Sequence, residues 1–89
     1  MRIKEGFILR RIANSNMVIP VGDNIVDFNG VITLNEAAAF LWKLLREGSD
    51  LSLLSAGLVE EYNIPVEQAQ TDAFAFVRQL ARANILEEC

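Results

Sequence analysis

The chain contains no histidine and a single cysteine, Cys89. Without histidine it cannot form the histidine-based general-base, nucleophile-activating or zinc sites that many enzymes use. One cysteine cannot form a disulfide within the chain, and thiolate metal sites need several such ligands at set spacings. The commonest catalytic and metal-binding classes are therefore excluded. The absence of a disulfide framework also favours a reducing, cytoplasmic setting.

Long hydrophobic runs are missing as well. The longest uninterrupted apolar run covers residues 37–42, whereas a membrane span needs about 18 such residues. Near the start of the chain, the apolar residues 7–9 are followed at once by Arg10 and Arg11, which is too short for the core of a signal peptide. We therefore expect no membrane-spanning segment, no export signal and a cytoplasmic protein.

What the chain does contain is a high share of apolar residues, 52% of 89, with a formal net charge of -4. This length fits one domain, because domains have roughly 100–200 residues. A fold of this mass buries only about 64% of the surface of its unfolded chain. We therefore expect one domain over residues 1–89 with a small core.

The first third of the chain is rich in β-branched and aromatic residues broken by turn formers, and this pattern predicts strands. Residues 7–13 and 17–21 are predicted to form a hairpin around residues 14–16. Residues 25–28 and 31–33 flank Asn29-Gly30, the strongest short hairpin signal. A two-residue turn there would pair Phe28 with Val31 and Val26 with Thr33. We therefore expect a small antiparallel sheet of three strands, or of four short ones.

From Leu34 onward, apolar residues recur at helical spacing and predict three helices. Asn35 is a suitable N-cap for the first helix, which Gly48 ends, and either Ser49 or Asp50 caps the second. The third helix opens at Pro65 and runs to about residue 83. Its inward residues are predicted to be Val66, Ala69, Ala73, Phe76, Val77 and Leu80. The expected fold class is α+β, a winged helix-turn-helix-like domain with its strands in front.

A winged-helix fold suggests DNA binding, and the charges argue against it. The second helix has no Lys or Arg and ends in Glu60-Glu61, and the third carries Glu67 and Asp72 in its first half. Affinity for DNA comes largely from neutralising phosphates, so acidic recognition elements are unfavourable. The basic residues cluster in the first eleven positions, where a solvated strand face explains them. We therefore predict no nucleic-acid partner, and a winged-helix transcription regulator remains the alternative function.

Candidate binding residues lie on the third helix. Arg78 and Arg82 are four residues apart and share a face, either as a solvated helix end or as a flank of a peptide groove. Phe74 lies off the edge of the core row, as core flank or as groove wall. Adjacent carboxylates such as Glu60 and Glu61 point apart on a helix and do not form a general acid and base. The sequence therefore offers a binding surface and no catalytic residues.

Three groups of residues form a pattern that covers nearly the whole chain. They are Val31-Ile32-Thr33-Leu34-Asn35-Glu36 running into Ala39, Phe40, Leu41 and Trp42, then Glu61-Tyr62, then Ala69 and Asp72 ahead of Phe76 and Leu80. This pattern resembles the PqqD family, which includes the recognition elements of ribosomally made, post-translationally modified peptides. The first hairpin looks like the variety found beside radical SAM maturases.

The resemblance implies a non-catalytic adaptor without a cofactor, which binds the leader of a precursor peptide and presents it to a modifying enzyme, such as a radical SAM maturase. Family members add the leader as a strand beside the third strand, in a cleft walled by the third helix. Carried onto this chain, the implied peptide-binding residues are Val31, Ile32, Thr33 and Leu34 on the strand, and Phe74, Val77, Arg78 and Ala81 on the helix. Arg78 would pair with an acidic leader side chain. An open strand edge also makes a homodimer through the sheet plausible.

Overall fold

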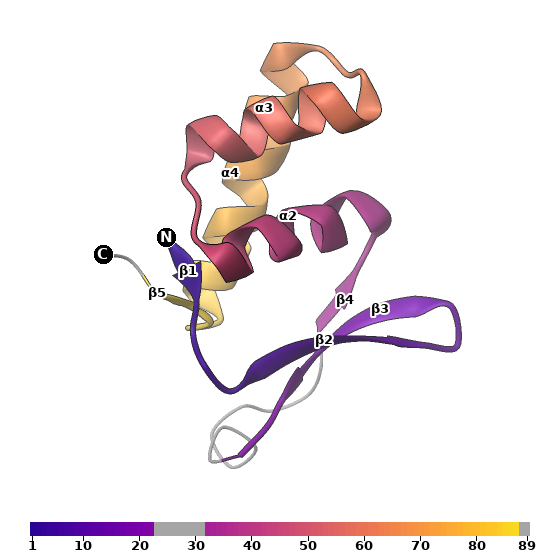
Figure 1. Ribbon diagram of the computed structural model, residues 1–89, viewed down its shortest axis with the longest axis vertical. Helices are drawn as coiled ribbons and strands as arrows, with labels where there is room; N and C mark the ends of the chain where they lie inside the picture. Colours follow the sequence, from indigo (N-terminus) through magenta and orange to yellow (C-terminus); the bar gives the residue numbers. More distant parts are fainter. Residues whose placement is uncertain (23–31, 88–89) are drawn as a thin grey trace.

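The computed structural model describes residues 1–22 and 32–87 (Figure 1). Its elements, in chain order, are β1 (Arg2–Ile3), β2 (Phe7–Ile12), β3 (Ser15–Pro20), β4 (Ile32–Leu34), α2 (Glu36–Glu47), α3 (Leu51–Tyr62), α4 (Val66–Arg82) and β5 (Leu86–Glu87). A small antiparallel sheet is thus followed by three helices, as the sequence predicted. The predicted strand over residues 25–28, the Asn29-Gly30 turn and Val31 lie outside the described residues.

The main sheet has the order β2-β3-β4, with both pairs antiparallel. The turn between β2 and β3 contains two residues, Ala13 and Asn14, with φ of 50° and 67°. Two consecutive positive φ angles are typical of a type I′ hairpin turn, whose twist matches that of the strands. The turn therefore lies earlier than the predicted residues 14–16, and Ser15 and Asn16 belong to β3.

Replacing Ala13 with glycine is expected to raise the free energy of unfolding by about 0.5–1 kcal/mol, because alanine is strained at positive φ. Chemical denaturation measures the change. The control is Ala56→Gly in α3, where the same exchange removes a good helix former and should cost about 1 kcal/mol. Two changes of the same sign would mean that Ala13 is not strained.

The helix ends follow the sequence closely. The Asn35 side-chain oxygen accepts a hydrogen bond from the Ala38 backbone N–H at 2.8 Å, and Asp50 does the same for Leu53. Asp50, rather than Ser49, is therefore the cap of α3. Gly48 follows α2 with φ of 95°, a conformation that only glycine adopts readily. These local signals fix where β4 gives way to α2 and where α2 gives way to α3.

A second, two-stranded sheet joins the two ends of the described chain. β1 pairs antiparallel with β5, and Ile3 lies opposite Leu86 (Figure 1). The Met1 amine donates a hydrogen bond to the Ser49 carbonyl, and the Ser49 N–H donates to the Met1 carbonyl, both at 2.9 Å. Neither of these two-residue strands is among the strands predicted from the sequence.

The hydrophobic core draws on both sheets and all three helices. Its largest fully buried side chains are Trp42, Leu41, Leu45, Leu54, Leu58, Leu80, Ile85 and Val18. Helices α2 and α3 approach closely at Gly57, where an added Cβ would lie 3.1 Å from the Leu44 side chain and 3.3 Å from that of Phe40. One predicted core residue is wrong: Val66 is 56% exposed, because it starts α4 at the rim of the helical layer rather than beneath it.

Candidate functional site

Strand β4 lies at the end of the main sheet. Ile32, Thr33 and Leu34 pair with Val18, Met17 and Asn16 of β3. Within residues 1–22 and 32–87, no strand pairs with the other edge of β4. Leu34 is buried and anchors the strand, whereas Thr33 is exposed. Among the described strands, β4 therefore has one edge with backbone groups that an added strand can pair with.

A hollow of about 220 Å³ begins where β4 ends. It is enclosed mainly by the first half of α2 and the middle of α4, and we call it the α2/α4 hollow. Its lining residues are Asn35, Ala37, Ala38, Leu41, Leu58, Asp72, Ala75, Phe76 and Gln79. Alanines on both helices keep the hollow open, and Asn35, Asp72 and Gln79 add polar groups to its apolar walls. It can accept a short apolar side chain from an extended peptide.

The helix residues predicted for the site do not share one face of α4. Val77 is buried in the core at 8% exposure, so its side chain packs inside the protein. Phe74 is 54% exposed and lies on the flank of α4 that faces α3. Ala81 is exposed in the last turns of the helix. None of the three lines the α2/α4 hollow.

Arg78 lies closer to the α2/α4 hollow. A neighbouring hollow on the outer side of α4 is lined by Thr71, Phe74, Ala75, Arg78, Gln79 and Arg82. The two hollows share Ala75 and Gln79. Two guanidinium groups therefore line the hollow next to the α2/α4 hollow, and guanidinium groups bind carboxylates by charge-assisted hydrogen bonds.

Sequence reasoning missed Asp72, Ala75 and Gln79 as lining residues. Phe76 was recognised only as a core residue, and it is indeed buried. Ala75 carries no chemical signal, because an alanine in a helix reads as a neutral surface position. A predicted helical period identifies the buried row, but the hollow depends on how α2 and α4 are placed against each other.

The start of α2 is fixed to the sheet by a small polar cluster. The Arg11 guanidinium donates a hydrogen bond to the Glu36 carboxylate at 2.9 Å, and the amide of the buried Asn16 donates to the same oxygen at 3.3 Å. These contacts join β2, β3 and the first residue of α2. Both hydrogen bonds, together with the positive charge of Arg11, hold the pKa of the Glu36 carboxyl below its ordinary value of 4.5.

This cluster predicts a pH dependence. Because the folded pKa of Glu36 is lowered, its carboxylate stabilises the fold above the unfolded pKa, and that stability is lost as the pH falls through the folded pKa. We expect Glu36→Gln to lower the thermal midpoint at pH 7, and the difference from wild type to shrink on acidification below pH 4.5.

Glu67→Gln is the matched control for Glu36→Gln, since it removes a carboxylate from the first turn of α4. Both substitutions lose a favourable interaction with a helix dipole, but only Glu36 also has Arg11 as a partner. Equal pH-dependent losses in the two variants would assign the effect to the helix dipole alone.

In the described part of the chain, no group of three or more His, Cys, Asp or Glu side chains could hold a metal ion. No helix among the same residues is long and apolar enough to cross a membrane. What the described chain does offer is a strand edge, a hollow that adjoins it and a basic flank.

A small sheet followed by three helices, with one strand edge unpaired by the described strands, defines a winged-helix-like α+β domain. The profile described as Coenzyme PQQ synthesis protein D (PqqD) matches residues 17–86. The chain belongs to the PqqD family, which confirms the resemblance read from the sequence. Among curated proteins no significant match is found.

Two solved structures share the fold. One is TbiB1 in complex with the TbiA(beta) leader peptide, with a TM-score of 0.78 and 20% identity, over 100% of this chain and 98% of that one. The other is lasso peptide synthetase B1 complexed with the leader peptide, with a TM-score of 0.71 and 20% identity, over 91% and 89% of the two chains. At this identity the two comparisons show the fold alone.

Proposed function

We propose that residues 1–89 act as one non-catalytic recognition domain, which binds the leader of a ribosomally made precursor peptide and presents it to a modifying enzyme. The observation that carries this proposal is the edge of β4, unpaired by the described strands, which leads into the α2/α4 hollow. Membership of the PqqD family supports it, as do two proteins of the same fold that were solved with leader peptides.

In this proposal the leader pairs with β4 as an additional strand. Main-chain hydrogen bonds to the edge give affinity, and pockets for alternate side chains give specificity. The α2/α4 hollow receives an apolar leader side chain beside Ala75 and Phe76. Arg78 and Arg82 pair with an acidic residue of the leader, because guanidinium groups bind carboxylates by charge-assisted hydrogen bonds.

The partner in this proposal is a peptide-modifying enzyme, for example a radical SAM maturase, and the chain acts in the cytoplasm, where precursor peptides are made. Without peptide, the same strand edge can pair with a second copy, so a homodimer that the leader dissociates is part of the proposal.

The direct test is titration with the leader segment of a short peptide encoded beside the gene. We expect saturable binding, which isothermal titration calorimetry measures, while random duplex DNA should show no strongly salt-dependent binding. Failure to bind any such leader, with circular dichroism confirming a folded protein, would reject the proposal. Tight DNA binding that weakens steeply with salt would support the winged-helix regulator instead.

Proline substitutions at Ile32 and Thr33 test the role of the β4 edge. Successive residues of an antiparallel strand turn their N–H groups to opposite neighbours, so one proline removes a donor toward β3 and the other a donor toward the open edge. We expect the variant that loses the donor toward the open edge to keep most of its stability and to lose about 1 kcal/mol of leader affinity, roughly fivefold. The variant that loses the donor toward β3 should lose stability as well. Calorimetry and urea denaturation measure the two effects. Equal losses of affinity and stability in both variants would argue against strand addition.

A further inference from the structure

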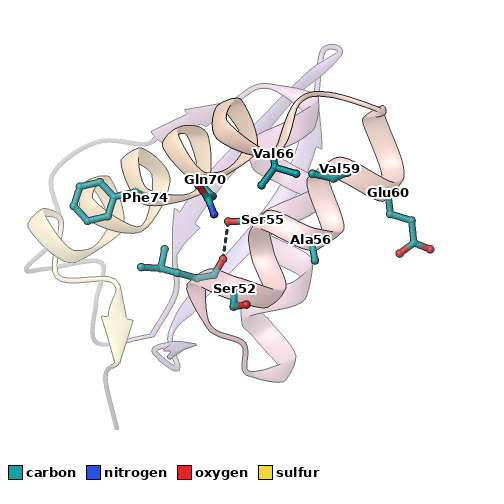
Figure 2. Close-up of a pocket in the computed structure, with 9 residues that line it drawn as sticks. Ser52, Ser55, Ala56, Val59, Glu60, Val66, Gln70 and Phe74 are labelled. Carbon is teal, nitrogen blue, oxygen red and sulfur yellow. Dashed lines mark hydrogen bonds between the residues drawn. The ribbon is translucent and has the colours of Figure 1, made fainter.

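Helices α3 and α4 enclose a second, larger concavity, which we call the α3/α4 groove (Figure 2). Its volume is about 650 Å³, within the range of protein binding pockets. Small residues of α3, Ser52, Ser55 and Ala56, line it together with Gln70 of α4, and larger side chains stand around them. The larger side chains are Leu51, Val59, Val66, Phe74 and Glu60.

The rim of this groove exposes large apolar side chains. Phe74 is 54% exposed, Val66 56% and Leu51 37%. The Ser55 hydroxyl is already used, since it donates a hydrogen bond to the Leu51 carbonyl at 2.8 Å (Figure 2). The groove therefore combines an apolar rim with the polar side chains of Ser52, Gln70 and Glu60, and exposed apolar side chains gathered around a concavity are typical of an interaction site.

Charge specifies what can bind there. Residues 47–77 contain six acidic side chains and no Lys or Arg, and the six are Glu47, Asp50, Glu60, Glu61, Glu67 and Asp72. Glu60 lines the groove itself, Glu67 follows the rim residue Val66, and Asp50 precedes Leu51. Among the residues that line the groove Glu60 alone is charged, and Arg78 lies one turn of α4 beyond Phe74. An occupant with apolar side chains and with positive charge at the Glu60 end is therefore complementary to the groove. A second copy presenting the same face would meet like charges.

The α3/α4 groove and the α2/α4 hollow lie on different flanks of α4. Each helical residue rotates by about 100°, which places Gln70 and Phe74 far around the helix from Asp72, Phe76 and Gln79. The linings of the two concavities have no residue in common. Phe74 also lines the neighbouring hollow, together with Arg78 and Arg82, so the groove meets the basic flank at that one residue. A leader in the α2/α4 hollow would therefore leave the rest of the groove free for another partner.

We propose that the α3/α4 groove docks a basic amphipathic helix of a partner protein, whose apolar face packs on Phe74, Val66 and Leu51 while its Lys and Arg side chains meet Glu60 and Glu67. A concavity with small residues at its floor and larger apolar side chains around them suits a helix laid into a groove. That this partner is the modifying enzyme rests on the proposed function, whereas the chemistry of the docking surface does not.

The test uses a fluorescein-labelled synthetic peptide of about 18 residues, long enough to form a helix, with one leucine face and lysine flanks. Fluorescence anisotropy measures its binding to the full chain. Two control peptides accompany it: one has the same composition with the leucines dispersed, and the other carries glutamate in place of lysine. We expect saturable binding of the first peptide alone, weakening as salt screens the charges.

Two matched pairs of variants locate the site. Phe74→Gln should weaken binding about tenfold, as loss of an apolar anchor does. Leu53→Gln should change it by less than about twofold, since Leu53 is equally exposed at 59% but lies outside the groove. Likewise Glu60→Lys should weaken binding more than Glu47→Lys, which makes the same charge change outside the groove.

Several outcomes would overturn this proposal. Equal binding of the dispersed peptide would reduce the interaction to non-specific charge attraction. Equal losses in Phe74→Gln and Leu53→Gln would place the site elsewhere. If the leader displaces the labelled peptide, the leader itself binds in the groove. If the protein forms a dimer that Phe74→Gln dissociates, a second copy binds there. Leader binding is measured separately, so its absence would reject the proposed function and leave the groove experiment readable.

Discussion

Replacing Trp42 with alanine is expected to lower the free energy of unfolding by about 3–5 kcal/mol. Trp42 is fully buried in α2 and is the largest side chain of the core. Removing it takes away the most apolar surface that one substitution can remove here, and leaves a cavity that the surrounding helices can close only in part. This loss is a large share of the stability of a domain of this size, which is about 5–15 kcal/mol.

Trp42→Phe separates packing from hydrogen bonding. The indole N–H of Trp42 is buried and has no hydrogen-bond partner among the residues that the structure describes. A phenyl ring therefore loses no hydrogen bond and removes a polar group that is costly to bury, which offsets part of the lost volume. We expect Trp42→Phe to cost less than about 1.5 kcal/mol, well below the alanine variant.

Urea denaturation followed by circular dichroism measures both variants, because Trp42 is the only tryptophan and its fluorescence disappears with it. Leu53→Ala is the control, an exposed apolar residue whose loss should change stability by about 0.5 kcal/mol or less. Equal costs for Trp42→Phe and Trp42→Ala would mean that the indole N–H contributes a hydrogen bond to the folded state.

The parts of the fold that the sequence predicted well are those set by neighbouring residues. Asn35 caps α2 through its own side chain, and Gly48 ends the helix because its backbone adopts a positive φ. Likewise Asp50 caps α3 through its own side chain. Such signals act over a few residues, so the pattern of residue types records them directly.

The parts that it did not predict depend on residues far apart in the chain. β1 and β5 are two residues each, too short to show a strand pattern, and their pairing joins Arg2 to Glu87. The turn was predicted at residues 14–16 rather than at Ala13 and Asn14, because an alanine does not indicate a positive φ. The face of α4 that meets α2 was not predicted either. A helical period identifies the buried row of a helix, but it does not say which other helix packs on each side of that row.

The face of α4 that binds the leader can be identified by substitutions at two alanines of this helix, Ala75 and Ala81. The family resemblance implied a peptide-binding wall of Phe74, Val77 and Ala81, whereas Ala75 lines the hollow that adjoins β4. We expect Ala75→Arg to fill the α2/α4 hollow and weaken leader binding by about 2 kcal/mol or more, roughly thirtyfold. Ala81→Arg should have little effect.

The two substitutions are closely matched. Both alanines are exposed on α4, and arginine is nearly as good a helix former as alanine, so stability should change by about 0.5 kcal/mol or less in each. Both add one positive charge, so any attraction to an acidic leader is present in each variant. Calorimetric titration with the same leader peptide then isolates the steric effect. If Ala81→Arg alone weakens binding, the leader uses the face of α4 first read from the sequence, and the hollow beside Ala75 is not its site.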